Sequence, residues 1–500
     1  MRRFLALLLV TAATTLGLTT TAAAATPGFS VSYTTIPGDG GTPLKGFLVR
    51  PTGRGPGPFP VLVMPSSWSV PDIEYVGAAA KLATASGYEV VSYTSRGFWD
   101  SAGTIEVAGP QDVADLSRVV DWALASTPAD PARVGAAGIS YGAGISLLAA
   151  AADKRIRAVV AMSAWADLAK SLYPNQTVSA LAVEGLIDAG KLTGRPGPVL
   201  RQAEKDYRAG DFDAVLPIAP VRSAASKIDA VNANGAAIMI GNAWEDSIFP
   251  PSQVLDFYQR LTGPKRIMLA PGDHGTNDGP GAVGLPNDIW SAAGRWFDHY
   301  LGGAANGVDR EQPVQLKPAN GGAWHGYPSL SAGRQDSIGL GQAKVIAGVD
   351  TIAGSGIPLL SGALQGYLNL PTGVATPLVN RLNAGVWSGS TYSAGVTVQG
   401  TPQVHATVTT SAADTSLFAY LYDVNALGVG SLITHKPYTI RGAKPGSTTT
   451  LDFGLEPVQW NVPAGHHLTL VVDTVDPRYR SESTLGSTVT ISGSLAIPLA

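Results

Sequence analysis

The sequence predicts an α/β domain followed by an all-β domain. From about residue 59 to residue 301, apolar runs that fit strands alternate with segments that fit helices. This alternation is typical of a mostly parallel sheet covered by helices on both faces. After Gly302-Gly303 the composition changes to short alternating runs rich in Gly, Thr, Ser and Val, which predict a β-sandwich or jelly roll.

The strongest local signal is the break at Gly138-Ile139-Ser140-Tyr141-Gly142, between an apolar run and an Ala- and Leu-rich helical segment. A strand, a G-x-S-x-G turn and a helix in this order form the nucleophile elbow of an α/β-hydrolase. The turn requires glycine at 138 and 142, because a Cβ there would clash with the neighbouring strand and helix. A Gly-rich turn in an ordinary doubly wound sheet is the competing interpretation.

The elements around the elbow support a hydrolase domain over residues 26–303. The expected elements are a hairpin at 31–36 and 43–50, strands at 59–64, 89–94, 156–162, 236–241 and 264–269, and helices at 73–86, 112–126 and 287–301. Between about residues 167 and 233 the alternation fails, and helical segments at 181–192 and 199–209 replace it. We interpret this stretch as a helical cap over the C-terminal edge of the sheet, where such folds bind ligands.

The all-β domain is expected over residues 304–500. Its clearest strand-like runs are 404–408, 417–422, 449–453 and 467–472. Residues 342–389 show no clear period, and no element is assigned to them.

An α/β-hydrolase places its acid and then its base after the nucleophile in the chain. Glu245 and Asp246 both follow the predicted strand at 237–241. Asp246 is preferred because Asp followed by an apolar residue and then Pro is the usual arrangement at this position. His274 follows the next strand and is the only histidine between Ser140 and the helix at 287–301. Asp273 is expected to be a turn residue.

These residues predict a serine-hydrolase mechanism. Neutral His274 takes the proton of Ser140 as the hydroxyl attacks a carbonyl, while Asp246 orients the imidazole ring. The acyl-enzyme that results is then hydrolysed by water. The backbone N–H of Tyr141 is expected to be one oxyanion donor, and the loop from Ser66 to Trp68 is expected to supply the other.

Four tryptophans follow predicted strands and are expected to line the substrate pocket: Trp68, Trp99, Trp165 and Trp244. The alternative is that they only fill the space between sheet and cap. An aromatic pocket would suit an apolar or proline-like acyl group.

With these residues placed, the chain resembles the cocaine esterase and X-prolyl dipeptidyl-peptidase family of α/β-hydrolases. The matching segments are residues 138–142, Arg96-Gly97 with Ser101 and Gly103, 244–250, 271–275, 400–402, 423–424 and 463–466. The resemblance implies a hydrolase of esters or amides with a helical cap and a galactose-binding-like β domain. An X-prolyl dipeptidyl-peptidase is the alternative to an esterase.

The sequence departs from that family's pattern at two places. Ser66 stands where members often carry a tyrosine whose hydroxyl is the second oxyanion donor. Ser247 and the residues after it replace acids that can bind a substrate amine, although Glu184 or Asp188 of the cap could serve instead.

Composition and the N-terminus limit the other possibilities. The formal charge is −3 and no basic stripe occurs, so no nucleic acid partner is expected. The seven histidines form no metal-binding pattern and cysteine is absent, so neither a metal nor a cofactor is expected. Arg2 and Arg3, an apolar run and the alanines at 22–25 predict a cleaved signal peptide over residues 1–25, and thus a secreted protein.

Two alternatives stay open. A membrane anchor would need a longer apolar run than the N-terminus offers, so no stable membrane insertion is expected. A carbohydrate-binding protein on an inactive hydrolase scaffold would explain the β domain, although a brace beside the active site explains it better. The expected partner is a small-molecule or peptide substrate, and the sequence gives no oligomeric state.

Overall fold

The computed structural model describes residues 26–331 and 333–500. The predicted signal peptide, residues 1–25, lies outside this part of the chain. The hydrolase domain is built on a ten-stranded sheet in the order β1-β2-β4-β3-β5-β6-β7-β8-β9-β10. Its strands are β1 (Gly28–Pro37), β2 (Pro43–Thr52), β3 (Phe59–Pro65), β4 (Glu89–Tyr93), β5 (Ala129–Ile139), β6 (Ile156–Met162), β7 (Ala237–Ala243), β8 (Lys265–Ala270), β9 (Val314–Leu316) and β10 (His325–Tyr327).

The centre of this sheet is parallel, and its two ends are antiparallel. β1 and β2 form the predicted hairpin, and β2 pairs antiparallel with β4. From β4 to β9 every neighbouring pair is parallel, before β10 turns back along β9. The C-terminal ends of β5, β7 and β8 therefore meet at one edge of the sheet, which is where the candidate catalytic residues follow them.

Helices cover both faces of the sheet, as the alternating sequence predicts. The helices are α1 (Val76–Ser86), α2 (Pro110–Ser126), α3 (Tyr141–Ala152), α8 (Ile228–Asn234), α9 (Pro251–Arg260), α10 (Gly279–Ala282) and α11 (Asp288–Tyr300). α1 and α11 share one apolar core with the sheet, and α2, α3, α8 and α9 share another on the opposite face. Most strand residues are buried because both faces are covered.

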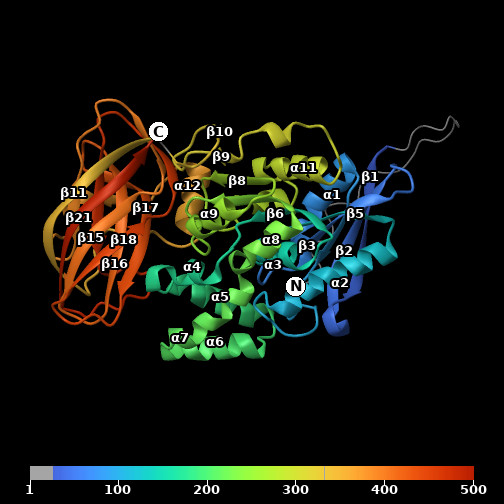
Figure 1. Ribbon diagram of the computed structural model, residues 1–500, viewed down its shortest axis with the longest axis horizontal. Helices are drawn as coiled ribbons and strands as arrows, with labels where there is room; N and C mark the ends of the chain where they lie inside the picture. Colours follow the sequence, from blue (N-terminus) through green and yellow to red (C-terminus); the bar gives the residue numbers. More distant parts are fainter. Residues whose placement is uncertain (1–25, 332) are drawn as a thin grey trace.

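The segment between β6 and α8 is the helical cap that the sequence predicts. It contains α4 (Leu168–Leu172), α5 (Ala180–Thr193), α6 (Pro198–Ala209) and α7 (Phe212–Val215), joined by short 3-10 turns. Figure 1 shows these helices gathered below the sheet, beside the C-terminal domain.

The C-terminal domain is β-rich and contains two antiparallel sheets. One has six strands: β11 (Arg334–Ile346), β14 (Val396–Gly400), β15 (Gln403–Thr410), β18 (Thr448–Gly454), β19 (Val458–Val462) and β21 (Thr488–Leu499). The other has five: β12 (Gly373–Ala375), β13 (Gly385–Ser388), β16 (Thr415–Val424), β17 (Val429–Ile440) and β20 (His467–Asp473). The finer expectation of a jelly roll stays a prediction.

The predicted boundary between residues 303 and 304 does not agree with the sheet. β9 and β10 lie beyond it and belong to the ten-stranded sheet, because β9 pairs parallel with β8. Both strands are only three residues long, which explains why their alternation is not visible in the sequence.

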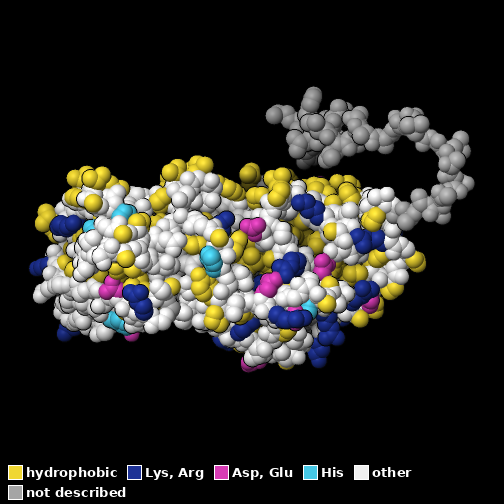
Figure 2. Space-filling view, turned by 90° about the horizontal axis from the view of Figure 1, so that it is seen from above, with side chains coloured by type: hydrophobic (Ala, Val, Ile, Leu, Met, Phe, Trp, Pro, Cys, Tyr) yellow, Lys and Arg dark blue, Asp and Glu magenta, His cyan; other side chains and the backbone are white. Residues whose placement is uncertain are grey.

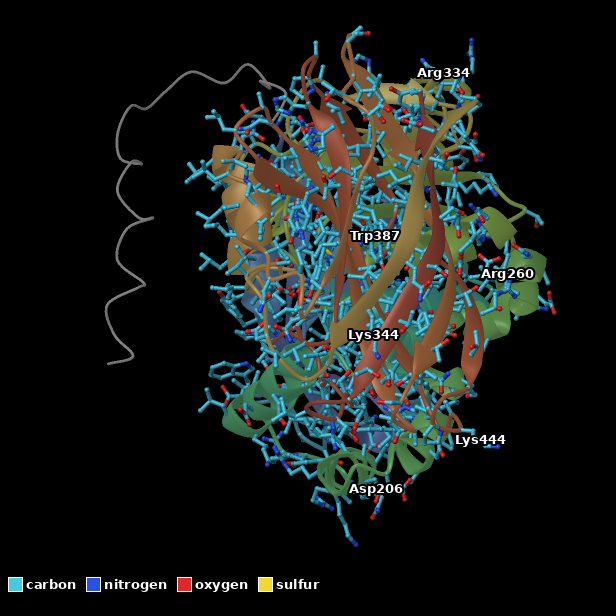
Figure 3. All side chains as sticks on the ribbon, turned by 90° about the vertical axis from the view of Figure 1, so that its left-hand side faces the viewer. Asp206, Arg260, Arg334, Lys344, Trp387 and Lys444 are labelled. Carbon is cyan, nitrogen blue, oxygen red and sulfur yellow. The ribbon has the colours of Figure 1, made fainter. Side chains whose placement is uncertain are left out.

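The stretch that the sequence leaves unassigned contains the helix α12 (Leu360–Leu368), which packs on the loops after β7 and β8. The Leu359 N–H donates to Ser247 Oγ at 3.2 Å, and the Tyr367 hydroxyl donates to the carbonyl of Thr276. In Figure 3 the β domain, marked by Lys344 and Trp387, stands in front with the cap, marked by Asp206, below it. The second domain therefore touches both the cap and the C-terminal edge of the first domain's sheet.

The face of the molecule in Figure 2 offers no strong electrostatic signal. The face in Figure 2 carries scattered charges of both signs without a basic stripe. Every helix in residues 26–331 and 333–500 is too short or too polar to cross a bilayer.

Candidate active site

Ser140 lies on a strained turn between β5 and α3. Its backbone angles are φ 55° and ψ −115°, a conformation that a residue with a side chain rarely adopts. A Cβ on Gly138 would lie 2.4 Å from the backbone carbon of Gly142, and one on Gly142 would lie 2.0 Å from the carbonyl oxygen of Pro65. Both glycines are therefore required by close backbone approach, at the helix and strand contacts that the elbow motif predicts.

Ser140, His274 and Asp246 form a hydrogen-bonded chain at the C-terminal edge of the sheet. The Ser140 Oγ lies 2.8 Å from Nε2 of His274, and Nδ1 of His274 lies 3.0 Å from each carboxylate oxygen of Asp246. Glu245, the other acid considered, makes no hydrogen bond to this histidine and lines a small cavity together with residues of the C-terminal domain.

The loop that carries the acid is held by its own backbone. The Ile248 and Phe249 N–H groups donate to Oδ1 of Asp246 at 3.0 and 2.7 Å. Asp273 lies in a turn as expected, but it is buried and also accepts the Ser247 N–H at 2.7 Å. It thus ties the loop of the base to the loop of the acid.

The charge on His274 is set by the buried groups around it. Burial acts to lower its pKa, but the carboxylates of Asp246, Asp273 and Asp278 raise the pKa above its ordinary value of 6.5. Asp278 is buried beneath the histidine loop and accepts the Ser163 hydroxyl at 2.7 Å, while Ser163 Oγ accepts the Gly275 N–H at 3.0 Å. Burial raises the pKa of Asp278 to about 7.

One expected oxyanion donor is well placed and the other is not. Tyr141 is the first residue of α3, so its N–H has no carbonyl in a preceding helical turn. The Ser66 N–H is not free to be the second donor, because it donates to Tyr93 O at 2.9 Å in the sheet, and Ser66 Oγ accepts the Ser95 N–H. The sequence could not show that this N–H continues the strand pairing.

Beyond Ser66, the next N–H groups of the loop have different partners. The Ser67 N–H donates to Oε1 of Glu74 at 2.6 Å, and burial raises the pKa of Glu74 to about 7. The backbone N–H of Trp68 donates to no group in the described part of the chain. Trp68 lines the same cavity as Ser140 and Tyr141.

The hydroxyl of Tyr141 has a structural role that the sequence did not reveal. It donates to Oδ2 of Asp112 at 3.1 Å and accepts the Ala108 N–H at 2.6 Å. Val107 and Ala108 both have positive φ angles, 55° and 53°. Tyr141 therefore holds α3 against a strained loop. Val107 of that loop lines the cavity at Ser140.

A cavity of about 170 Å³ opens from Ser140 beneath the cap. Its walls are almost entirely apolar and come from the elbow, the cap helices and the loop after β7. The lining includes Trp68, Trp165, Leu172, Ile187, Leu200, Ala203, Tyr207, Phe212, Val215 and Phe249. Such a shape accepts an apolar group attached to the carbonyl that Ser140 would attack.

Two of the four predicted tryptophans line this cavity. Trp68 and Trp165 do so, and their indole N–H groups donate to carbonyls of the cap, Leu186 at 2.9 Å and Arg222 at 2.7 Å. Trp99 and Trp244 do not: Trp99 is 43% exposed, and Trp244 is buried at the contact between the domains. The place of a tryptophan just after a strand therefore does not show whether its side chain points into the cavity or away from it.

The charged residues of the cap are paired with one another. Glu204, the acid at the cavity wall, binds Lys191 and Arg208 at 2.5 and 2.9 Å. Glu184 binds Arg208 at 3.2 Å, and neither Glu184 nor Asp188 lines the cavity. Within residues 26–331 and 333–500, no cluster of three or more His, Asp or Glu residues could hold a metal ion.

The sequence matches two domain families. Residues 39–276 match X-Pro dipeptidyl-peptidase (S15 family), and residues 391–495 match the X-Pro dipeptidyl-peptidase C-terminal non-catalytic domain. A polyketide transferase of Penicillium crustosum is 25% identical over 273 residues, which are 46% of this chain and 86% of that protein.

Solved structures share the whole architecture at low sequence identity. An aminopeptidase of the marine sediment archaeon Thaumarchaeota archaeon has a TM-score of 0.74 at 13% identity, covering 98% of this chain and 99% of that one. An α-amino acid ester hydrolase has a TM-score of 0.69 at 14% identity, covering 97% and 98%. A CocE/NonD family hydrolase of Staphylococcus aureus has a TM-score of 0.67 at 13% identity, covering 94% of both chains.

The solved structures show a shared fold, and the two domain matches show an enzyme in which a hydrolase domain precedes a β-rich domain. The chain is a hydrolase with both domains of the X-Pro dipeptidyl-peptidase (S15) family.

Proposed function

We propose that the protein is a secreted serine hydrolase that cleaves esters of apolar acids through Ser140, His274 and Asp246. The observation that carries the proposal is the hydrogen-bonded chain of these three side chains at the mouth of an apolar cavity. Ser140 Oγ forms a bond to the carbonyl carbon while His274 Nε2 accepts its proton. That proton then passes to the leaving alkoxide, which departs as an alcohol.

A second half-reaction regenerates the enzyme. Water gives a proton to His274 and its oxygen attacks the acyl carbon, after which Ser140 Oγ leaves and recovers the proton. The N–H groups of Tyr141 and Trp68 are the oxyanion donors in this proposal, since both lie at the cavity and neither is committed to the sheet.

The cavity favours an ester over an X-prolyl peptide. A dipeptidyl-peptidase needs a carboxylate to bind the α-amine of its substrate, whereas Glu204, the acid at the wall, is neutralised by Lys191 and Arg208. The alternative, an X-prolyl dipeptidyl-peptidase, is supported by the family match over residues 39–276.

A fluorophosphonate probe tests the nucleophile. Wild-type protein is expected to be labelled, S140A is expected to stay unlabelled, and S226A, which changes an exposed serine of the cap, is expected to label as wild type. Turnover in S140A should fall by about 10³-fold or more. Full turnover in S140A would remove the proposal.

Paired substrates test the bond and the acyl group. We expect a p-nitrophenyl ester of a medium-length fatty acid to be hydrolysed with a higher kcat/KM than any Xaa-Pro p-nitroanilide. The reverse order would favour the dipeptidyl-peptidase.

Export is supported by Arg2, Arg3 and the apolar run that follows them. Expression of the full chain in a secreting host should give extracellular protein that begins near residue 25 or 26 by N-terminal sequencing. Intracellular protein that retains Arg2 and Arg3 would contradict export.

A further inference from the structure

A second, smaller cavity lies between the two domains, on the far side of Asp246 from the nucleophile. Its volume is about 30 Å³, enough for a water molecule. Three carboxylates of the hydrolase domain line it, those of Glu245, Asp246 and Asp273. The C-terminal domain contributes Arg478, the one arginine in the described lining.

Arg478 is buried without a direct ion pair. It is 6% exposed, and within residues 26–331 and 333–500 it has no carboxylate partner within 4.0 Å. Its Nε has no hydrogen-bond partner, and its Nη1 lies 3.4 Å from Nε2 of His435. A buried cation is costly unless nearby negative charge compensates it, and the carboxylates that share its cavity provide that compensation.

The backbone around Arg478 is fixed to the cap. The Leu181 N–H donates to Arg478 O at 3.1 Å, and the Arg480 N–H donates to Val178 O at 3.0 Å. The Arg478 N–H itself donates to Asp476 Oδ1 at 2.8 Å. This short pairing holds the guanidinium at a defined place behind the catalytic acid.

We propose that Arg478 is a positioning residue through which the C-terminal domain supplies positive charge to the Ser140–His274–Asp246 chain. The inference rests on the proposed function. Arg478 balances the clustered carboxylates of Asp246 and Asp273 and so keeps the Asp246 carboxylate directed at His274 Nδ1. The second domain touches no substrate in this role, yet the catalytic chain depends on it.

The other groups around the cavity do not replace this charge. Burial lowers the pKa of His435 well below its ordinary value, so His435 is neutral. Glu456 is bound to Lys436, which cancels both charges. Asp476 adds negative charge, and the hydroxyl of Tyr479 hydrogen-bonds to His435 Nε2 at 2.8 Å. Arg478 is therefore the one lysine or arginine in the described lining of this cavity.

The test compares neutral and charged side chains at position 478. R478M and R478Q are expected to lower kcat at least tenfold with little change in KM, and to move the acid limb of kcat/KM to higher pH. The direction follows because loss of a nearby cation makes proton binding by His274 more favourable. R478K is expected to restore most of kcat and the position of the limb.

R480M is the matched control. Arg480 lies two residues away and stacks on Phe212, which lines the substrate cavity, with 5.1 Å between guanidinium and ring centre. It does not line the small cavity between the domains. The acid limb of kcat/KM against pH should not move in R480M. The melting temperatures of all variants show whether a loss of activity comes from the lost charge or from unfolding. Two neutral variants, R478M and R478Q, are used so that one can still be measured if the other does not fold.

Two results would overturn the inference. One is a folded neutral variant whose kcat and acid limb of kcat/KM are the same as in wild type. The other is an R478K variant whose kcat is lowered as much as that of R478M. Both are distinct from failure of the proposed function, which S140A alone tests. If S140A is inactive while R478M behaves as wild type, only the role of Arg478 is lost.

Discussion

Nδ1 of His274 lies 3.0 Å from both carboxylate oxygens of Asp246, so one N–H is shared by the whole carboxylate. This geometry fixes the ring and leaves Nε2 free to accept the Ser140 proton. Replacing Asp246 by Asn presents an amide that no longer favours the imidazolium or the required tautomer. We expect D246N to lower kcat by about 10⁴-fold, measured by steady-state ester hydrolysis.

E245Q is the matched control for that change. Burial raises the pKa of Glu245 to about 8, so this side chain is largely protonated near neutral pH and Gln resembles it. Its kcat should stay within a few-fold of wild type. A loss in E245Q as large as that in D246N would assign the acid to the wrong residue.

The pH profile should report the carboxylates around His274. Catalysis needs the neutral ring, and the pKa of His274 is raised, so activity should fall on the acid side with a midpoint above 6.5. Asp278 contributes to that upward shift. In D278N the midpoint of kcat/KM against pH should therefore move to lower pH, while a shift to higher pH would contradict this electrostatic account.

The elbow glycines should respond differently from a glycine of the cap. In G142A the new methyl would lie 2.0 Å from the carbonyl oxygen of Pro65, so we expect a loss of more than about 2 kcal/mol in the free energy of unfolding together with loss of activity. Gly185 lies inside α5 with nothing within 4 Å of its Cβ position, so G185A should gain about 0.5–1 kcal/mol. Urea unfolding of both variants checks the contrast.

The length of the acyl group should be set by the cap. Ala203 of α6 lines the cavity, and A203F would fill much of its 170 Å³. We expect kcat/KM for an octanoate ester to fall at least about tenfold, with a much smaller change for acetate. Q202F places the same ring on the exposed side of α6 and should leave the chain-length profile unchanged.

The loop that offers the Trp68 N–H should depend on Glu74. Its carboxylate accepts the Ser67 N–H at 2.6 Å and so fixes the backbone just before Trp68. E74A should lower kcat by about tenfold or more with little change in KM, because it removes an acceptor from a buried donor. E74Q keeps an oxygen at that place and should retain most of the activity, and equal losses in both variants would point to a role for the charge instead.

The residues of the proposed catalytic chain could be predicted because each follows its own strand in a fixed order. Gly138 and Gly142 mark the strained turn at Ser140, and His274 has no competitor in the segment where a base is required. The sequence favours Asp246 over Glu245 as the acid, and the contact between Asp246 and His274 in the structure supports this preference.

The remaining features depend on contacts between distant segments. The Ser66 N–H pairs with Tyr93 in the sheet, and the inward or outward direction of Trp99 depends on how the loop after β4 turns. α12 is held largely by the loops after β7 and β8 rather than by its own sequence, so residues 342–389 carry no clear period. The proposed link between Arg478 and the acids Asp246 and Asp273, more than 200 residues away, has no local signature in the sequence.

The two short strands β9 and β10 have a practical consequence for separating the domains. A chain cut after residue 303 would lose both strands and leave Lys265–Ala270 of β8 with an open row of backbone donors and acceptors. Such a bare edge recruits other strands, so the shortened protein would self-associate whatever the C-terminal domain does for catalysis. An independent hydrolase unit should therefore extend past Tyr327, where the sheet ends within its own chain.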